Sequence, residues 1–404
     1  MNIVRCVAAA GIVALLSSCA CRTPSDLSPV PQEIADWLGD SSRRYPEATP
    51  ATEWSPAKNI LWSVSIGANM FSSEIIVDGK ILLVAEPSML VCVDAATGTI
   101  LWKRHNDFSD LPEKVEKTPA QGDPGNTTPT PVSDGQFVYA SFGCGIVACY
   151  DLRGQRKWIT HIKGKPPQYG RSASPVVVGD KLLVSIGNLT ALDTKTGKEI
   201  WKAEAVKETY GTPAKARIGA VDAVVTPTGE IVRTSDGAVL ASTDGRLLYV
   251  SPIVHDGVVY FINASSVALQ LPDKATDTLP VKNLWECSLE GEFFASPVYA
   301  NGLLFTVGGQ GKLFIVDAQD GKILVSKDLP FESRDAPVYS SPTVAGKYVF
   351  VSNVAGETLV IEAAREYKEV KLNRLPDGSG GTPVFKGRRM FIRGGRKLYC
   401  IGEK

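Results

Sequence analysis

Residues 174–184 read Ser-Pro-Val-Val-Val-Gly-Asp-Lys-Leu-Leu-Val, and this unit recurs along most of the chain. A proline can open a β-strand but cannot lie in the middle of a paired one. The β-branched run after Pro175 favours a strand, and the Gly179-Asp180 step is typical of a tight hairpin turn. The unit therefore predicts two short antiparallel strands, the first of which begins at the proline.

The unit repeats at almost even spacing. The prolines of its Ser/Thr-Pro steps lie 44, 38, 39, 45, 45 and 41 residues apart, a period typical of four-stranded propeller blades. An eighth copy covers residues 74–84, with Glu74 in the proline position. We therefore predict an all-β fold, an eight-bladed β-propeller of four-stranded antiparallel blades. The seven steps are Thr130-Pro131, Ser174-Pro175, Thr212-Pro213, Ser251-Pro252, Ser296-Pro297, Ser341-Pro342 and Thr382-Pro383.

In several copies of the repeat a second sequence element follows the Ser/Thr-Pro unit. Residues 191–201 read Ala-Leu-Asp-Thr-Lys-Thr-Gly-Lys-Glu-Ile-Trp, and Asp94, Gly98 and Trp102 repeat the spacing. The aspartate ends one strand, the glycine permits a turn with positive φ, and the tryptophan ends an outer strand. The element resembles the tryptophan-docking motif of the pyrroloquinoline-quinone-like (PQQ-like) propeller repeats, and the resemblance covers residues 59–404.

That family includes quinoprotein dehydrogenases as well as non-catalytic members, and the chain is similar to one of the latter, the propeller lipoprotein of the outer-membrane barrel-assembly machinery. The resemblance implies the fold and leaves the activity open. A tryptophan that recurs once per blade on an outer strand is expected to bury its ring against the next blade. We assign this structural role to Trp62, Trp102, Trp158, Trp201 and Trp285.

The two ends of the repeat region predict how the ring closes. Residues 60–66 have the pattern of an outer strand but precede any complete blade, whereas residues 398–402 match a third strand with no outer strand after them. An incomplete blade would expose a row of unpaired backbone groups. We therefore predict that the N-terminal strand completes the last blade and closes the ring, within a propeller domain of residues 59–404.

The first residues have the composition of an export signal. Arg5 supplies a positive charge, residues 7–16 are apolar but too short to span a bilayer, and Leu-Ser-Ser follows directly before Cys19. We interpret residues 1–18 as a lipoprotein signal peptide and Cys19 as the acylated first residue of the mature chain. An ordinary secretory signal cleaved near Ala20 is the alternative.

The residues after the signal predict a location. Ala20, and not aspartate, follows the cysteine, which favours the outer membrane facing the periplasm over retention at the inner membrane. Residues 19–58 are polar and proline-rich at first, which is typical of a tether, and lead into the propeller. Residues 31–38 are predicted to form a short helix.

Composition excludes several classes of partner. The chain carries 43 basic and 43 acidic residues, so no global field favours nucleic acid, and we expect no nucleic-acid partner. No Cys-x-x-Cys or paired Cys/His spacing indicates zinc, and no metal site is predicted. Cys144 and Cys149 flank one predicted hairpin, where either two buried free thiols or a disulfide would fit an oxidising compartment.

No catalytic site is recognisable. The three histidines lie at positions 105, 161 and 255, and no nucleophile-elbow, zinc-protease or phosphate-loop motif occurs. The resemblance implies that a dehydrogenase of this family would carry adjacent cysteines over its cofactor and ligands for Ca²⁺, and no two cysteines are adjacent here. We therefore predict no catalytic residue and no cofactor. The alternative is a PQQ-dependent dehydrogenase of the periplasm that uses PQQ with Ca²⁺.

One set of positions predicts a binding face. Three residues before each strand-opening proline, or before Glu74, five of the eight positions are aromatic, and these positions are expected near one mouth of the central channel. Arg171 and Arg334 lie nearby in sequence and are candidate polar anchors. A layer of rings that plugs the channel is the alternative to a ligand platform. The five aromatic residues are Phe71, Tyr210, Tyr249, Phe294 and Tyr339.

Together these patterns predict a monomeric, exported, lipid-anchored propeller that works by binding and contacts the membrane through its lipid anchor. It is expected to act as a scaffold for other envelope proteins or as a receptor for a polymer or small ligand.

Overall fold

The computed structural model describes residues 35–37, 44–68, 71–117, 125–275, 279–378 and 381–403. These residues belong to one compact unit, residues 33–404. The predicted signal peptide and Cys19 lie outside the described residues. No helix in the described ranges has the length and hydropathy to cross a membrane. Their secondary structure is almost entirely β, with one short 3-10 turn at Phe108–Asp110.

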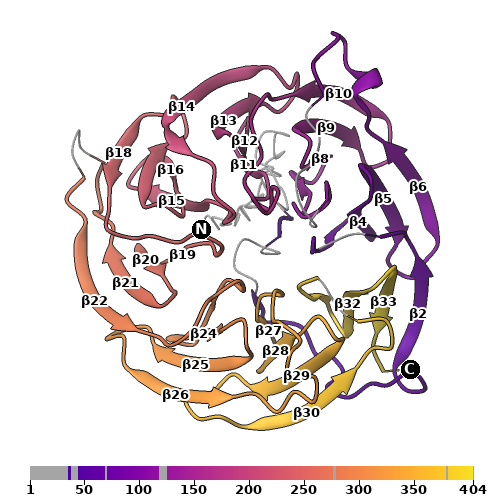
Figure 1. Ribbon diagram of the computed structural model, residues 1–404, viewed down its shortest axis with the longest axis vertical. Helices are drawn as coiled ribbons and strands as arrows, with labels where there is room; N and C mark the ends of the chain where they lie inside the picture. Colours follow the sequence, from indigo (N-terminus) through magenta and orange to yellow (C-terminus); the bar gives the residue numbers. More distant parts are fainter. Residues whose placement is uncertain are drawn as a thin grey trace, which may run out of the picture. The chain divides into compact units, whose positions relative to one another are not determined.

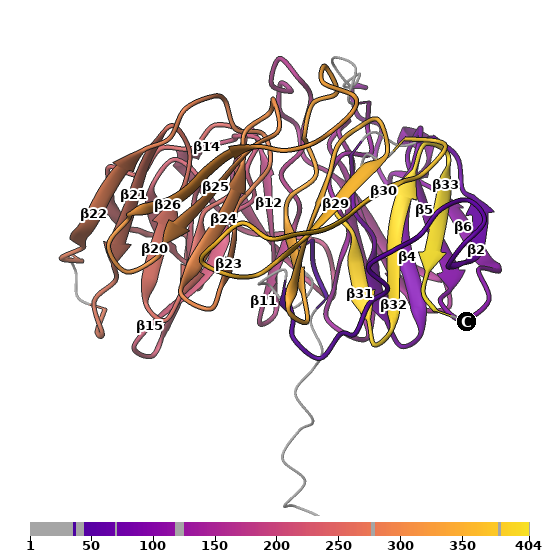
Figure 2. The same ribbon diagram turned by 90° about the horizontal axis from the view of Figure 1, so that it is seen from below.

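The predicted eight-bladed propeller is confirmed. Eight antiparallel sheets stand around a central axis, and in seven of them the strands run from the channel to the rim in chain order (Figure 1). Figure 2 views the same blades from the side. The β-branched apolar runs and the tight Gly-containing turns thus form the antiparallel hairpins that the sequence predicts.

The blades are built from these strands: blade 1 from β3 (Ile75–Val77), β4 (Lys80–Ala85), β5 (Met89–Asp94) and β6 (Ile100–His105); blade 2 from β7 (Val132–Ser133), β8 (Phe137–Ser141), β9 (Ile146–Asp151) and β10 (Arg156–His161); blade 3 from β11 (Val176–Val178), β12 (Lys181–Ile186), β13 (Asn188–Asp193) and β14 (Glu199–Lys207); and blade 4 from β15 (Ala214–Ile218), β16 (Val221–Val225), β17 (Glu230–Arg233) and β18 (Val239–Ser242).

The second half of the ring follows the same plan: blade 5 has β19 (Ile253–His255), β20 (Val258–Phe261), β21 (Ser265–Gln270) and β22 (Lys282–Ser288); blade 6 has β23 (Val298–Ala300), β24 (Leu303–Val307), β25 (Lys312–Asp317) and β26 (Ile323–Asp328); blade 7 has β27 (Thr343–Ala345), β28 (Tyr348–Ser352), β29 (Glu357–Glu362) and β30 (Glu369–Arg374); and blade 8 has β31 (Val384–Lys386), β32 (Arg389–Gly394), β33 (Lys397–Ile401) and β2 (Ile60–Ser65).

Ring closure by the N-terminal strand is confirmed as well. β2 pairs antiparallel with β33, so that Trp62 lies opposite Cys400 and Ser63 opposite Tyr399. Figure 1 shows β2 beside β33, although more than three hundred residues separate them in the chain. β33, the third strand of blade 8, is therefore paired on both sides, with β32 and with β2.

The serine and threonine residues of the repeat form a closed ring of hydrogen bonds. In each blade the backbone N–H of this residue donates to the side-chain hydroxyl of its counterpart in the next blade, at 2.8–3.1 Å. Each bond satisfies a buried backbone donor and fixes the spacing of two innermost strands. In order around the ring the residues are Ser73, Thr130, Ser174, Thr212, Ser251, Ser296, Ser341 and Thr382, whose N–H returns to Ser73.

The repeated tryptophans lie against glycines of the neighbouring blade. A Cβ placed on these glycines would lie 2.5–2.7 Å from the tryptophan ring, so only glycine permits this contact. Four of the indole N–H groups donate to a backbone carbonyl in the same turn, at 2.9–3.2 Å. The ring-to-glycine pairs are Trp62 with Gly98, Trp102 with Gly154, Trp158 with Gly197, Trp201 with Gly237 and Trp285 with Gly321.

The described cysteines are free thiols, so no disulfide joins Cys144 and Cys149. Cys92, Cys149 and Cys400 lie directly opposite docking tryptophans on the adjacent strand. Burial raises the pKa of Cys92 and of Cys400 to about 12. Protonated thiols of this kind are poor nucleophiles, so these side chains act as small packing residues.

An N-terminal segment occupies one end of the channel. Ala35 forms an antiparallel bridge with Ser133 of blade 2, so the predicted helix at residues 31–38 is wrong for the described part. β1 (Arg44–Tyr45) adds in parallel to the innermost strand of blade 7. The backbone N–H of Gly346, in the turn after that strand, donates to the Tyr45 carbonyl at 2.9 Å. The segment therefore lies at the ends of the innermost strands opposite to the predicted aromatic positions.

Candidate interaction face

The five predicted aromatic side chains, joined by Tyr169, make a continuous arc where the chain enters the innermost strands. Each of the five stands two residues before a member of the hydroxyl ring, which fixes its backbone. Neighbouring rings along the arc are in contact with centroid distances of 4.9–6.0 Å, mostly tilted or edge-on, as aromatic pairs prefer. The order along the arc is Phe71, Tyr339, Phe294, Tyr249, Tyr210 and Tyr169.

The arc is open to solvent at several points. Tyr169 is 52% exposed, Tyr339 is 37% exposed, and Leu248, next to Tyr249 in the chain, is 53% exposed. Burial raises the pKa of Tyr249, and the nearby Tyr169 and Glu292 add to the effect, so its hydroxyl stays neutral. The rings pack on one another, and the arc is most exposed at Tyr169 and Tyr339. An arrangement of this kind presents a rigid apolar surface to a partner.

The structure places Arg171 away from this surface. Its side chain is 2% exposed and pairs with Glu208, Nε to Oε1, at 2.9 Å. Its two terminal nitrogens donate to the carbonyl oxygens of Gly143 and Gly164, at 2.6 and 2.7 Å. Arg171 therefore joins loops of blades 2 and 3 and offers no free donor to a ligand. Arg334, by contrast, is exposed on the loop that leads into blade 7.

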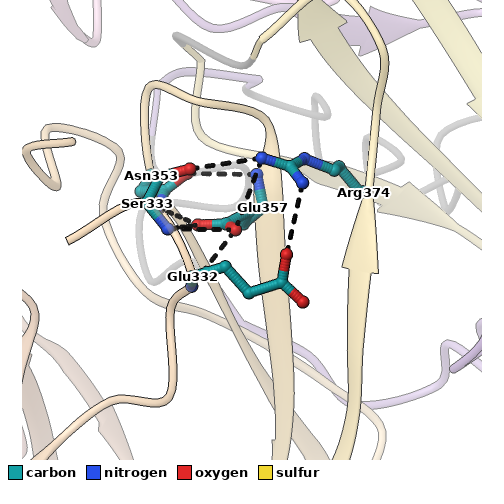
Figure 3. A network of polar contacts seen from close by, with 5 residues as sticks. All are labelled: Glu332, Ser333, Asn353, Glu357 and Arg374. Atoms are coloured by element: carbon teal, nitrogen blue, oxygen red, sulfur yellow. Dashed lines mark hydrogen bonds and ion pairs between the residues drawn. The ribbon is translucent and has the colours of Figure 1, made fainter.

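A buried carboxylate holds the loop that carries Arg334 and leads to Tyr339. Glu357, which begins β29, is 1% exposed, and its Oε1 and Oε2 accept the backbone N–H groups of Glu332 and Ser333 at 3.2 Å each. Asn353 donates to Glu357 Oε2 at 2.7 Å. Arg374 bridges Glu357 and Glu332 at 3.7 and 3.3 Å (Figure 3). Because both carboxylate oxygens accept hydrogen bonds, the backbone of the loop is held in one position.

A second carboxylate, in blade 1, holds another inter-blade loop in the same way. Glu86 Oε1 accepts the backbone N–H groups of Asn126 and Thr127, at 2.9 and 3.0 Å, and the Thr127 hydroxyl at 2.6 Å. These residues lead into blade 2. Two inter-blade loops of this face are thus tied to neighbouring blades by glutamate side chains. Hydrogen bonds to a carboxylate are stronger than those between neutral groups.

The described residues offer little to acid–base or metal chemistry. No group of three His, Cys, Asp or Glu side chains within the described ranges could hold a metal ion. Burial lowers the pKa of His161, which packs on Phe108, and of His255, whose ring lies 3.9 Å from that of Tyr299. Both imidazoles are therefore packed side chains and lie apart from each other in blades 2 and 5.

Comparison with known proteins decides the family. The sequence model of the family described as outer membrane protein assembly factor BamB matches residues 55–279 and 274–366. The chain belongs to this family. BamB of Burkholderia pseudomallei (strain K96243) is 25% identical over 212 residues, 51% of this chain and 42% of the relative. BamB of Yersinia pestis is 22% identical over 309 residues, 74% and 62% of the two chains. The chain thus matches less than two thirds of either relative's length.

Solved structures share the propeller fold with assembly factors and with enzymes alike. BamB from Moraxella catarrhalis matches with a TM-score of 0.63 at 13% identity, over 85% of this chain and 97% of that one. A europium-containing methanol dehydrogenase matches with a TM-score of 0.59 at 14% identity, over 87% of each chain. At such identities the likeness concerns the fold alone, and function has to be argued from the site.

A dehydrogenase also occurs among the sequence relatives. A quinoprotein ethanol dehydrogenase of Pseudomonas aeruginosa is 26% identical over 211 residues, 45% of this chain and 32% of that protein. The residues present do not fit a quinone site with its metal ion. The described ranges contain no three-ligand group for a cation, and the sequence has no adjacent cysteine pair. We derive no catalytic step through such a cofactor.

Sequence reasoning missed three features of this face. Tyr169 and Leu248 stand at no fixed distance from a repeat proline, so counting along the repeat cannot find them. Glu357 looks like an ordinary strand residue, and only the structure shows that its carboxylate holds a loop. A buried glutamate in an otherwise apolar strand is the one signal that could have indicated it.

Proposed function

We propose that this protein is a non-catalytic scaffold in outer-membrane protein assembly, and that it binds a protein partner through the aromatic arc. In this proposal it is exported, held at the periplasmic face of the outer membrane by a lipid on Cys19, and monomeric. Membership of the BamB family supports the assembly role. The observation that carries the binding role is the continuous arc of six rings, partly exposed and rigidly supported.

The physical properties of the arc suit a protein partner. Tyrosine and phenylalanine supply large contact areas with few rotatable bonds, so little conformational entropy is lost when they are covered. Energetic hot spots of protein interfaces are enriched in tyrosine and are surrounded by polar residues. Here Glu292 is an exposed negative charge near Tyr249, and Arg334 is an exposed positive charge on the loop that leads to Tyr339. A rim of mixed charge favours a neutral or mixed partner surface over a polyanion.

A pull-down from detergent-solubilised envelopes tests this function. The bait is the full chain, either as wild type or with Tyr249→Ser and Phe294→Ser combined. The matched control is Ile200→Ser with Leu284→Ser, at side chains that are 44% and 40% exposed on the outer strands of blades 3 and 5. We expect outer-membrane assembly proteins to be recovered by the wild type and the control and to be lost with the arc variant. Equal recovery by all three baits would contradict the proposed use of the arc.

The dehydrogenase relative suggests a second test. We expect the purified protein, mixed with PQQ and Ca²⁺, to retain no quinone after gel filtration and to reduce no dye with alcohols or sugars. Stoichiometric retention with turnover would replace the scaffold function by an oxidoreductase.

A further inference from the structure

One blade departs from the repeat at its innermost strand. Seven blades place proline directly after the hydroxyl-ring residue, whereas blade 1 places Glu74 after Ser73. The Glu74 side chain is 0% exposed, and neither of its carboxylate oxygens has a hydrogen-bond partner. A buried polar group without a partner is rare and destabilising in native proteins. The one blade that lacks the proline therefore also carries a buried carboxylate without a hydrogen-bond partner.

The nearest compensating charge lies across the seam between blades 8 and 1. Arg393 of β32 is 1% exposed, and its terminal nitrogens donate to the carbonyl oxygens of Val84 and Gly67 at 3.2 and 3.3 Å. Its Nε has no partner, and it forms no hydrogen bond with Glu74. Arg393 thus ties blade 8 to β4 of blade 1 and to the segment that joins the two blades, and leaves the Glu74 carboxylate unpaired.

The same seam lacks the docking hydrogen bond of the other tryptophans. Trp62 packs on Gly98 as its counterparts do, but its indole N–H has no partner. The carbonyl that corresponds to the acceptor in other blades belongs to Ala95, and Arg389 donates to it at 2.9 Å. Blade 8 is also the blade that the two distant ends of the chain complete together. The chain crosses this seam once, between β2 of blade 8 and β3 of blade 1, and the ring hydrogen bond from Thr382 to Ser73 crosses it as well.

We propose that the seam between blades 8 and 1 is a pH-sensitive joint of the propeller, closed while Glu74 carries a proton and loosened when Glu74 ionises. The inference does not depend on the scaffold function, because it concerns the ring itself. A proton on Glu74 removes the buried charge, whereas an ionised Glu74 gains hydration when the seam opens.

Other charged groups near Glu74 do not neutralise it. Lys386 of the adjacent innermost strand of blade 8 is exposed, and Lys80 of β4 pairs with Asp78 at 2.8 Å. The neighbouring β7 of blade 2 contributes no charged side chain. The N-terminal segment lines the same cavity, of about 320 Å³, with Asp36, Arg44 and Glu47. The Arg44 guanidinium lies over the Tyr299 ring of blade 6, 5.9 Å from its centroid. Asp36 pairs with Lys215 at 3.2 Å, and Glu47 is exposed.

The direction of the pH effect follows from the carboxylate. Burial, opposed by the charge of Arg393, raises the pKa of Glu74 from 4.5 to about 7. A carboxyl group whose pKa is higher in the closed state than in the open state stabilises the closed state, and this stabilisation is complete below the open-state pKa. For Glu74 the stabilisation of the closed seam is lost as the pH rises from 4.5 through about 7. Between about pH 5.5 and about pH 8.5 the opening equilibrium should rise by about tenfold or more.

Hydrogen exchange with mass spectrometry tests the joint in the full chain. We would measure the amides of β2, β3 and β32 at about pH 5.5 and about pH 8.5, after correction for the intrinsic chemical rate. In the wild type we expect the corrected opening equilibrium of these strands, and not that of blade 5, to rise with pH. E74Q removes the titrating group, and E74P restores the residue of the other seven blades. E357Q is the matched control at a buried carboxylate that has partners.

The proposal requires that E74Q and E74P abolish the pH dependence at the seam and that E357Q keep it. A seam that opens equally at both pH values in the wild type overturns it. A pH dependence that persists in E74Q and E74P overturns it as well, because another group would then be the sensor.

Discussion

The backbone N–H of Thr382 donates a hydrogen bond of 3.1 Å to the Oγ of Ser73, which stands 309 residues earlier in the chain. This bond completes a circuit in which every blade gives one N–H and offers one hydroxyl. The circuit lies directly beneath the aromatic arc, since the arc residues of the repeat stand two positions earlier. The same short motif therefore builds the ring and positions the aromatic arc.

The hydroxyl circuit can be tested by removing one acceptor. Ser251→Ala leaves the buried N–H of Thr212 without its partner, whereas Ser251→Thr keeps a hydroxyl of the kind that other blades use. We expect S251A to lower the free energy of unfolding by about 1–3 kcal/mol, and S251T to change it much less. Urea unfolding followed by tryptophan fluorescence measures both. If S251A is as stable as S251T, the circuit is not a stabilising element.

The docking contact can be tested at two glycines that differ mainly in their surroundings. Gly197 and Gly179 both have positive φ, +70° and +58°. A Cβ at Gly197 would lie 2.5 Å from the Trp158 ring, whereas a Cβ at Gly179 would meet nothing within 4 Å. Gly179→Ala measures the backbone strain alone, roughly 1–2 kcal/mol. Gly197→Ala should lose about 1–3 kcal/mol more through overpacking, in thermal or urea unfolding. Equal losses would mean that the tryptophan does not dock there in solution.

The lipid anchor remains a prediction from the sequence. We expect Cys19→Ala to abolish partitioning of the protein into the detergent phase and to leave it unprocessed or released, because several acyl chains at about 0.8 kcal/mol per buried CH₂ hold such a protein on a membrane. Cys21→Ala is the matched control and should behave as wild type. Normal membrane association of the C19A variant would place the anchor elsewhere.

The fold could be predicted because a repeat multiplies a weak local signal. One Ser-Pro-Val-Val-Val stretch is ambiguous, but eight copies at blade spacing are not. The closing strand was predictable because the two ends of the repeat complement each other. The pattern did not show why the residue before proline is serine or threonine, since the hydroxyl's partner lies in another blade.

The aromatic arc was predictable only where it follows the repeat. Counting back from the prolines finds Tyr249 and Phe294, whose ring centroids lie 5.0 Å apart. It cannot find Tyr169, which stands six residues before Pro175 and so outside the counted position. Arg171 was misplaced because sequence proximity to a mouth position says nothing about where a long side chain points, and a buried carboxylate, Glu208, holds it inward.

The central claim, that the aromatic arc is where this propeller meets its protein partner, is tested most directly by crosslinking in living cells. A photo-reactive phenylalanine analogue would replace Tyr249 or Tyr339 in the arc, and Ile200 on an outer strand as the control. We predict that both arc positions give crosslinks to outer-membrane assembly proteins and that the Ile200 position gives none at equal expression. Crosslinks from Ile200 alone, or none from either arc position, would contradict the account.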